Sequence, residues 1–434
     1  MPDICMVGTG YVGLVSGACL ADFGNTVICV DIDEDRISQI KNGIMPIYEP
    51  GLKELVSRNR DSGRLFFTTD LEEGVSESDV IFSAVGTPMG EDGSADLSAV
   101  YRVAADVAGY MKRYKVFVQK STVPVGTSEK VGQIIRENLK GDIDFERVSN
   151  PEFLREGSAI EDFMRPNRVV IGVDSPRARE IMREIYRPLY LLETPVVFTS
   201  VRTAELIKYA SNAFLAVKIS FINEMADLCE KLGADISDVA RTMGLDKRIG
   251  PKFLHAGIGY GGSCLPKDVA AILHTAENHG VDLKIISGAD QVNDARVERL
   301  MEKIYSEFPD IKGIDIAILG LSFKPNTDDI RHAPSLKFID RALSEGAELR
   351  VYDPIAMDNV REKYGSKLNY SDNAYGAIEG AEALVIMTEW NEFRVLDMDK
   401  VEELMKGRSI FDCRNIYKDV DLASKGFSYY SFGR

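Results

Sequence analysis

A glycine-rich segment in the second half of the chain leads to a cysteine that could act as a nucleophile. Residues 257–268 read GIGYGGSCLPKD, and their glycines would deliver Cys264 to the start of a helix predicted from Pro266 to Glu277. The positive end of that helix and Lys267, three residues on, both favour a thiolate. Asp268 lies one turn beyond the cysteine and would share its face. The pattern predicts a covalent-catalysis cluster, with a tight turn around a buried structural cysteine as the alternative.

A second glycine-rich segment, near the start of the chain, is typical of dinucleotide binding. A short apolar strand, Ile4 to Val7, precedes Gly8-Thr9-Gly10-Tyr11-Val12-Gly13, and an apolar helix follows as far as Phe23. The next strand, Thr26 to Val30, ends at Asp31, 18 residues past the last glycine. The glycines allow the pyrophosphate to approach, the helix start favours its charge, and the acid suits ribose hydroxyls. We predict an NAD site, with a chance glycine turn as the alternative and Arg36 leaving NADP open.

Strands and helices then alternate, which implies a parallel, doubly wound sheet. The strands that we predict are Leu65 to Thr69, Val80 to Val85, Val116 to Lys120, Arg147 to Asn150 and Val169 to Val173, with a helix from Leu97 to Met111. Cofactor contacts are expected from loops at the carboxyl ends of such strands. Gly86-Thr87-Pro88 and Ser121-Thr122-Val123-Pro124 stand at such ends, although ordinary turn chemistry explains each of them equally well.

Two further stretches carry side chains suited to chemistry. Val201 to Leu232 has no Gly or Pro and predicts one helix of about 45 Å, a spine that would join two domains and two subunits. On it, Lys208 and Asn212 lie one turn apart and could stabilise an oxyanion, or could be ordinary surface residues. Asn150 to Gly157 holds Glu152 and Glu156 four residues apart, for which a surface charge pattern is the alternative.

The last third of the chain repeats the rhythm of the first without its glycine fingerprint. We predict a polar helix from Asp290 to Phe308, a helix from Ala333 to Ser344, and strands at Ile314 to Phe323, Glu348 to Tyr352, Ala383 to Met387 and Ser409 to Phe411. The fold class is therefore α/β, with two Rossmann-like doubly wound domains joined by a long central helix. The expected domains are residues 1–200, a central helical segment at 201–298, and residues 312–434.

Composition excludes several classes of function. The chain has 434 residues and a net charge of −16, which argues against a nucleic-acid or anionic-membrane surface. No apolar run reaches membrane-spanning length, and Met1 to Cys5 runs into a strand without a signal-peptide pattern. The six cysteines form no CxxC pair, so reduced thiols in the cytoplasm are expected. The four histidines form no metal-binding motif, and we expect no metal.

A nicotinamide site and a nucleophilic cysteine together narrow the chemistry. Simple alcohol oxidation needs a base but no covalent intermediate, whereas a thiolate can hold an aldehyde as a thiohemiacetal. That adduct can lose a second hydride and leave as a hydrolysed thioester. The combination points to a carboxylic acid product, formed from an alcohol through two hydride transfers.

Several motifs resemble the UDP-glucose/GDP-mannose dehydrogenase family, in that family's order, over about residues 2 to 430. They are Gly8 to Gly13, Ser121-Thr122-Val123-Pro124-Val125-Gly126, Asn150-Pro151-Glu152-Phe153-Leu154-Arg155-Glu156, Lys208 with Asn212, Gly261-Gly262-Ser263-Cys264, and Phe323-Lys324-Pro325-Asn326-Thr327. The resemblance implies an NAD domain, a central segment that makes a homodimer, and a C-terminal domain that holds the nucleotide of a nucleotide-sugar substrate. It also makes a functional Cys264 the expected interpretation.

The resemblance implies a role for each matching residue. Cys264 would capture the C6 aldehyde, Lys208 and Asn212 would stabilise oxyanions, and Asp268 would relay protons through a water. Glu152 and Glu156 would orient or activate water for thioester hydrolysis, and Thr122 would lie near that water and the nicotinamide. The expected cofactor contacts are Gly8, Gly10, Tyr11, Val12, Gly13, Asp31, Arg36, Thr87, Thr122, Glu156, Lys267 and Arg331. The expected substrate contacts are Glu152, Phe153, Leu154, Lys208, Asn212, Arg248 (toward the neighbouring subunit), Phe253, Gly257, Tyr260, Phe323 and Lys324, with His255 in a position where some relatives carry a lysine.

Three functions remain open at this stage. The Asn150 to Glu156 motif and the Arg248 to Tyr260 segment look most like the branch that oxidises UDP-glucose to UDP-glucuronate with two NAD. The same chemistry on GDP-mannose or a UDP-N-acetylhexosamine is the first alternative, because Leu265-Pro266-Lys267 also occurs in relatives with other substrates. A nucleotide-binding protein without turnover is the second, and the intact Cys264, Asp268 and Lys208 argue against it.

Overall fold

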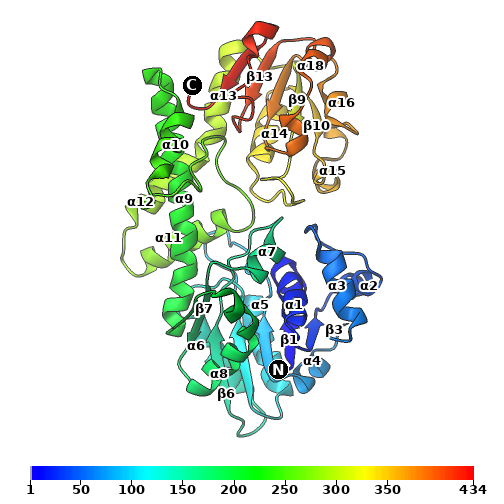
Figure 1. Cartoon of the computed structure of the whole chain (residues 1–434), viewed down its shortest axis with the longest axis vertical. Helices are drawn as coiled ribbons and strands as arrows, with labels where there is room; N and C mark the ends of the chain where they lie inside the picture. The colour runs from blue at the N-terminus through cyan, green and yellow to red at the C-terminus, as the bar shows by residue number, and fades with distance from the viewer. Residues whose placement is uncertain (1) are drawn as a thin grey trace. The chain divides into compact units, whose positions relative to one another are not determined.

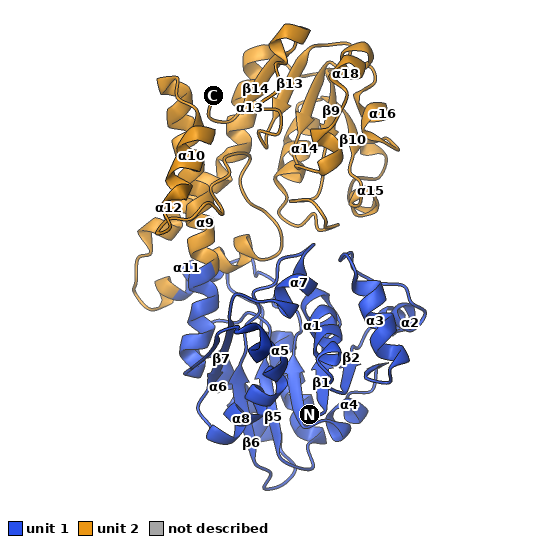
Figure 2. Ribbon diagram, in the orientation of Figure 1, with its two compact units in different colours: residues 1–211, 270–275 blue, residues 212–269, 276–434 orange. Residues whose placement is uncertain are grey.

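The computed structural model describes residues 2–434, which divide into two compact units (Figure 2). The first unit extends to Ser211 and also contains residues 270–275. The second contains residues 212–269 and 276–434. Across residues 2–434, no helix combines the length and the apolar content that a membrane span needs.

The first unit is built on an eight-stranded sheet in the order β3-β2-β1-β4-β5-β6-β7-β8. Its strands are β1 (Ile4–Val7), β2 (Val27–Val30), β3 (Leu65–Thr68), β4 (Val80–Ser83), β5 (Lys115–Gln119), β6 (Phe145–Ser149), β7 (Val169–Val173) and β8 (Val196–Thr199). Its helices are α1 (Tyr11–Asp22), α2 (Glu34–Lys41), α3 (Leu52–Asp61), α4 (Leu71–Glu77), α5 (Ser98–Tyr110), α6 (Thr127–Asn138), α7 (Ala159–Met164) and α8 (Pro176–Ile185), with the 3-10 helix η1 (Arg187–Leu192) (Figure 1).

Alternate residues of β1 explain why the sheet is covered on both faces. Ile4 and Met6 pack into one buried cluster, which includes residues of α1, α3 and α8. Cys5 and Val7 pack into another, which includes residues of α5 and α6. A strand that buries both faces needs a continuous apolar run, and this accounts for the sequence ICMV.

The prediction of an entirely parallel sheet is wrong at one pair of strands. β7 runs antiparallel to β6, while the other neighbouring strands are parallel. Asn150, which directly follows β6, donates its side-chain N–H to the carbonyl of Val170 at 2.8 Å. The chain therefore stays at the carboxyl end of β6 before β7 begins, and β7 has to run back. The edge strand β8 was not predicted.

A 32-residue helix, α9 (Val201–Leu232), runs from the first unit into the second, with the bounds that the sequence predicts (Figure 1). It is followed by α10 (Ile236–Leu245) and α11 (Leu265–Asn278). The predicted helix from 290 to 308 is wrong, because the chain forms α12 (Lys284–Asp294) and α13 (Arg296–Glu307) instead. They meet at Ala295, whose ψ of −9° departs from helix geometry. Asn293 and Arg296, on either side of the bend, both bind segment 257–260.

The second unit contains a six-stranded parallel sheet in the order β11-β10-β9-β12-β13-β14, which confirms the second Rossmann-like half. Its strands are β9 (Asp315–Leu319), β10 (Glu348–Tyr352), β11 (Asn369–Tyr370), β12 (Ala383–Ile386), β13 (Ser409–Asp412) and β14 (Ser428–Ser431). Its remaining helices are α14 (Pro334–Ser344), α15 (Met357–Tyr364), α16 (Ala374–Ile378), α17 (Asn391–Arg394) and α18 (Met398–Leu404), with the 3-10 turns η2 (Gly365–Lys367) and η3 (Ala423–Lys425). Strand β9 ends earlier than predicted, because Gly320 has a φ of +92° and packs tightly against Thr388.

Candidate active site

The loop between β1 and α1 has the shape that a dinucleotide pyrophosphate needs. Gly8 has a φ of +97°, and a Cβ added at Gly13 would lie 1.8 Å from the Gly8 carbonyl oxygen. By contrast, a Cβ at Gly10 would meet nothing within 4 Å. The loop is closed on its packed side and open where a phosphate would approach the start of α1. These residues therefore fit an NAD pyrophosphate.

The carboxylate of Asp31 is held toward this loop at the end of β2. Thr9 donates its backbone N–H and its hydroxyl to Asp31 Oδ2 at 2.7 and 2.8 Å, and Arg36 lies 3.4 Å away. Burial alone would raise the pKa of Asp31, but the hydrogen bonds from Thr9, one from the Asp33 N–H, and the Arg36 charge hold it below its usual value. A fixed, ionised acceptor at this position suits ribose hydroxyls.

Two other strand-end loops of the first unit are joined at the expected positions. The hydroxyl of Thr87, after β4, donates to the carbonyl of Thr122, after β5, at 3.0 Å.

Tyr11 of the glycine-rich loop contacts the buried carboxylate of Glu49, which also accepts the backbone N–H of Gly157 at 2.7 Å. The cofactor loop and the end of the Glu152 to Glu156 motif are therefore held by one carboxylate.

Glu152 and Lys208 form a buried ion pair. Glu152 Oε1 lies 3.1 Å from the ammonium of Lys208 on α9, and the two side chains are 6% and 4% exposed. Glu152 Oε2 accepts the backbone N–H of Leu154 at 2.5 Å. Lys208 and Arg168 both lie over the ring of Phe153, at 5.3 and 3.6 Å from its centroid. Sequence spacing alone did not predict this pair.

The Glu152 to Glu156 motif is not a uniform surface charge pattern. Arg155 turns to an exposed ion pair with Asp162 at 2.6 Å, and Glu156 is half-buried. Only Glu152 of the two glutamates is buried. The two carboxylates therefore stand in different environments.

In the second unit, Cys264 is the first residue before α11 and is half-buried. The hydroxyl of Ser263 lies 3.6 Å from its sulfur. Asp268 lies one turn along, is fully buried, and accepts the side-chain N–H of Asn212 at 2.6 Å. Its other oxygen lies 2.6 Å from the ammonium of Lys267. Thiol, carboxylate, amide and ammonium therefore gather at one helix start.

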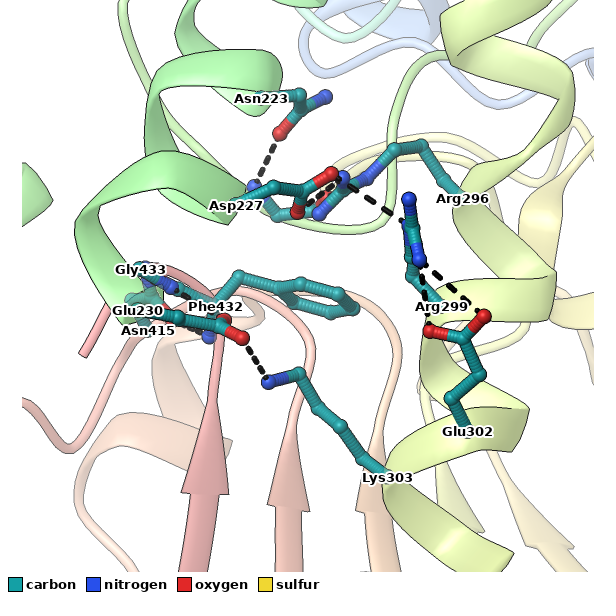
Figure 3. Close-up of polar contacts among 11 residues, drawn as sticks. Asn223, Asp227, Glu230, Arg296, Arg299, Glu302, Lys303, Asn415, Phe432 and Gly433 are labelled. Atoms are coloured by element: carbon teal, nitrogen blue, oxygen red, sulfur yellow. Dashed lines mark hydrogen bonds and ion pairs between the residues drawn. The ribbon is translucent and has the colours of Figure 1, made fainter. Parts of the chain in front are cut away.

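Gly257, the first residue of the cysteine segment, is held by side chains on two helices. Its N–H donates to Asn223 of α9 at 2.8 Å, and its carbonyl accepts the Nε–H of Arg296 at 3.0 Å. Figure 3 shows the surrounding network, in which Arg296 pairs with Asp227 at 2.8 Å and lies over Phe432. Arg296 is fully buried, so this network fixes the start of the segment.

The rest of the segment is packed too tightly for side chains at its glycines. Asn293 binds both the N–H and the carbonyl of Tyr260, at 2.8 and 3.2 Å. A Cβ added at Gly259 would lie 2.4 Å from Asn293, and one at Gly262 would lie 2.7 Å from the ring of Phe323. Close packing therefore requires glycine at these two positions.

The remaining predicted ligand contacts of the second unit, which are substrate contacts except for the cofactor contact Arg331, fall into two groups. Phe323 packs on Gly262, with the ammonium of Lys324 5.2 Å from its ring centroid. Arg331 pairs with Asp329 through two hydrogen bonds, and its carbonyl accepts the Gly262 N–H. Those three residues adjoin the cysteine segment.

The other group lies outside this packing. Arg248 is 89% exposed and pairs with Asp246, and His255 is exposed. Phe253 is half-buried and has a φ of +65°.

Sequence reasoning missed two arginines that bind this segment and the loops around it. Arg414 donates to the carbonyls of Phe323 and Gly259 at 3.0 and 3.3 Å, and Arg296 binds Gly257. Arg414 lies two residues after the end of β13, at the carboxyl end of the sheet, and that position was the available signal. Nothing in the sequence marked Arg296, because it lies in a charged helix.

Comparisons with known proteins cover the whole chain. Residues 2–190 match the NAD binding domain of the UDP-glucose/GDP-mannose dehydrogenase family, residues 202–295 its central domain, and residues 317–419 its UDP binding domain. The chain is 55% identical to UDP-glucose 6-dehydrogenase of Rhizobium meliloti (strain 1021), covering 99% of both chains. It is 46% identical to UDP-glucose 6-dehydrogenase TuaD of Bacillus subtilis (strain 168), covering 100% of this chain and 94% of that one.

A solved structure agrees with these relatives. The UDP-glucose dehydrogenase of the hyperthermophilic archaeon Pyrobaculum islandicum superposes with a TM-score of 0.93 at 37% identity, covering 99% of this chain and 97% of that one. The glycine-rich NAD loop, the buried Glu152–Lys208 pair and the cysteine at the start of α11 thus stand in a chain that matches one family throughout. The protein belongs to the UDP-glucose/GDP-mannose dehydrogenase family.

Proposed function

We propose that this protein oxidises UDP-glucose to UDP-glucuronate in two successive oxidations, with Cys264 as the covalent nucleophile. The observation that carries the chemistry is the cluster at the start of α11, where Cys264 precedes a buried Asp268 bound by Asn212 and Lys267. The sugar is inferred from relatives at 55% and 46% identity that are named UDP-glucose 6-dehydrogenase. NAD, when bound, accepts one hydride at each oxidation.

In the first oxidation, the substrate C6 hydroxyl must lose a proton as well as a hydride. We assign the proton to Asp268, through a water, because this carboxylate is held in place by two donors. Asn212 and Lys208, one turn apart on α9, would stabilise the developing oxyanion. The product of this step is the C6 aldehyde.

In the second oxidation, the Cys264 sulfur adds to the aldehyde carbon and gives a thiohemiacetal. Loss of a hydride from that carbon and of the hydroxyl proton leaves a thioester. Water then breaks the carbon–sulfur bond, which releases the carboxylic acid and restores the thiol. We assign Glu152, together with Glu156, to orient or activate this water near Thr122, because Glu152 is a buried carboxylate with both oxygens anchored.

The remaining site residues are proposed as ligand contacts. The NAD contacts would be the glycine-rich loop with Asp31, Arg36, Thr87, Lys267 and Arg331. The sugar-nucleotide contacts would be Phe153, Leu154, Phe253, Gly257, Tyr260, Phe323 and Lys324. The cations among them would supply a local positive lining for a diphosphate in a protein of net charge −16.

We also propose a homodimer that forms through α9. Five large apolar side chains on this helix are exposed, and four of them are Phe214, Phe221, Leu228 and Leu232. Their spacing of seven, seven and four residues places them along one face. An exposed stripe of this kind on a helix is typical of a protein interface. Arg248, which is 89% exposed and pairs with Asp246, would reach a substrate bound by the partner.

The six cysteines are all free thiols, which supports a reducing compartment, and we propose the cytoplasm.

The test of the function is the amount of NADH formed per molecule of sugar nucleotide. Two NADH per UDP-glucose are expected, with UDP-glucuronate as the product, and one NADH would mean that oxidation stops at the aldehyde. Parallel assays with GDP-mannose and UDP-N-acetylhexosamines separate the substrate alternatives. If no NADH forms with any of these sugar nucleotides, the result would support a nucleotide-binding protein without turnover.

A further inference from the structure

Lys120 is a buried lysine at the carboxyl end of strand β5, and the proposed mechanism does not use it. It follows β5 directly and is 4% exposed. Because Gln119 of β5 pairs with Ser149 of β6, the next residues along, Lys120 and Asn150, stand side by side at the carboxyl ends of the two strands. The ammonium of Lys120 donates to Asn150 Oδ1 at 3.1 Å.

The partners of this ammonium are neutral groups. Besides Asn150, it lies 3.5 Å from the hydroxyl of Tyr186, which itself donates to the same Asn150 oxygen at 2.5 Å. It also lies 5.7 Å from the ring centroid of Phe163. A buried charge with neutral partners is costly, so its retention calls for a compensating anion or a function.

The compensating anion is Glu152, which shares a cavity with Lys120. The cavity has a volume of about 50 Å³, and both side chains line it, together with Asn150, Phe153 and Tyr186. This is room enough for at least one water molecule, which polar groups on both sides could hold. Oε1 of Glu152 thus binds Lys208, and its Oε2 accepts the Leu154 N–H. The carboxylate also faces a second buried cation, Lys120, across a cavity that can hold water.

We propose that Lys120 is a positioning residue for Glu152, and that its ammonium orients this carboxylate for thioester hydrolysis, by its charge and through water in the shared cavity. The inference rests on the hydrolytic role that we propose for Glu152. It assigns Lys120 no contact with substrate or cofactor. Lys120 would then be the second cation at Glu152, after Lys208, and it would act in the hydrolysis step alone.

The charge state of Lys120 gives this role a pH dependence. Burial lowers the pKa of Lys120 to about 8, while the charge of Glu152 works to raise it and that of Lys208 to lower it further. Asp162, Arg168 and Tyr186 are the other titratable groups that line the cavity. Lys120 is therefore charged below about pH 8 and neutral above it. Its contribution should be present near neutral pH and fade as the pH rises through that value.

The experiment follows the covalent intermediate directly. The full-length protein is mixed with UDP-glucose and NAD, quenched at intervals, and analysed by intact-protein mass spectrometry for the thioester on Cys264. The variants are Lys120→Met, which removes the charge, Glu152→Gln, and Lys130→Met as a matched control at an exposed position on α6. Met has a side chain of similar length, and the two polar partners that Lys120→Met leaves behind, Asn150 and Tyr186, still bind each other.

Below the pKa of Lys120, we expect the thioester to decay about tenfold more slowly in Lys120→Met than in the unaltered protein, as for the loss of one neighbouring charge. The two rates should converge above that pKa, whereas a purely structural defect would leave their ratio constant. Lys130→Met should match the unaltered protein. Lys120→Arg, whose charge persists at every pH used, should retain hydrolysis.

Two results would overturn the proposal, and they can be told apart. If Glu152→Gln accumulates thioester but Lys120→Met does not, Lys120 has no role in hydrolysis while the role of Glu152 stands. If neither variant accumulates thioester, the assignment of Glu152 itself is wrong. Should Lys120→Met fail to fold, equal losses in Lys120→Arg and in Lys120→Gln at every pH would also reject the proposal.

Discussion

The ammonium of Lys208 lies 3.1 Å from the carboxylate of Glu152, and both groups are almost fully removed from water. Such a pair is held together strongly once formed, but it strands a charge when one partner is removed. The two groups are therefore fixed with respect to each other. Any role of one in catalysis depends on the presence of the other.

Lys208→Ala should lower kcat by roughly 100-fold, because it removes a donor to the developing oxyanion and releases Glu152. The affinity for NAD should be unchanged, since the cofactor loop and Asp31 are held by their own contacts. Steady-state kinetics and NAD titration measure the two effects. Lys231→Ala, at an exposed position on the same helix, is the control and should leave kcat as it is. A Lys208→Ala protein with full turnover would remove the assignment.

Iodoacetamide should label the native protein at Cys264 alone. Cys264 is half-buried at a helix start, whereas the other five cysteines are buried. Burial raises the pKa of Cys5 to about 12 and those of Cys19, Cys29 and Cys413 further, so their thiolates are scarce. Peptide mass spectrometry after brief labelling gives the site. The label should disappear in Cys264→Ser, together with formation of UDP-glucuronate, and equal labelling of a second cysteine would contradict the assignment.

Local patterns predicted the parts of the fold that depend on neighbours in sequence. The bounds of α9 follow from a run without Gly or Pro that ends at Gly233, and Asp31 follows from its distance to Gly13. The direction of β7 could not be predicted in this way. An apolar run such as VVIGV has the same pattern in either direction. The contact of Asn150 with Val170 sets where β7 begins.

The missing parts of the site are contacts between residues far apart in the chain. Arg296 reaches Gly257 over 39 residues, and Lys120 reaches Asn150 over 30. In sequence, the first lies in a charged helix and the second ends an ordinary strand, so neither stands out. Only tertiary structure shows that both cations are buried.

Arg296→Met should impair both stability and turnover. Arg296 is 1% exposed and binds Gly257 and Asp227, so its loss leaves a backbone carbonyl and a carboxylate without their donor, at a cost of about 3 kcal/mol. Arg299→Met is the matched control, because Arg299 contacts the same Asp227 but is 49% exposed. A surface pair of this kind contributes little. Thermal unfolding measures the stability and the rate of NADH formation measures the turnover, and equal results for both variants would show that the network of Figure 3 does not position the segment.

Asp31→Asn should destabilise the protein in a pH-dependent way. Because the pKa of Asp31 is lower in the folded state than the value of about 3.9 for an unfolded chain, its stabilisation is fully present above that value. It should be lost as the pH falls through the folded-state pKa. The difference in Tm between the two proteins should thus be constant near neutral pH and shrink below about pH 4. Asp35→Asn, at an exposed position nearby, should show no such difference. If acid does not change the Tm difference for Asp31→Asn, the stabilisation by Asp31 does not depend on the charge of its carboxylate.

Phe214→Arg and Leu228→Arg should convert a dimer into monomers. Both side chains are exposed on α9, so the substitutions cost the single chain little, but a charge in an apolar interface between copies would have to be buried without a partner. Light scattering coupled to size-exclusion chromatography gives the mass. Leu191→Arg is the control, because Leu191 is even more exposed but belongs to η1 and not to α9. If the Leu191 variant dissociates and the α9 variants do not, the interface lies elsewhere; if the unaltered protein already has the mass of one chain, the stripe on α9 is not a dimer surface.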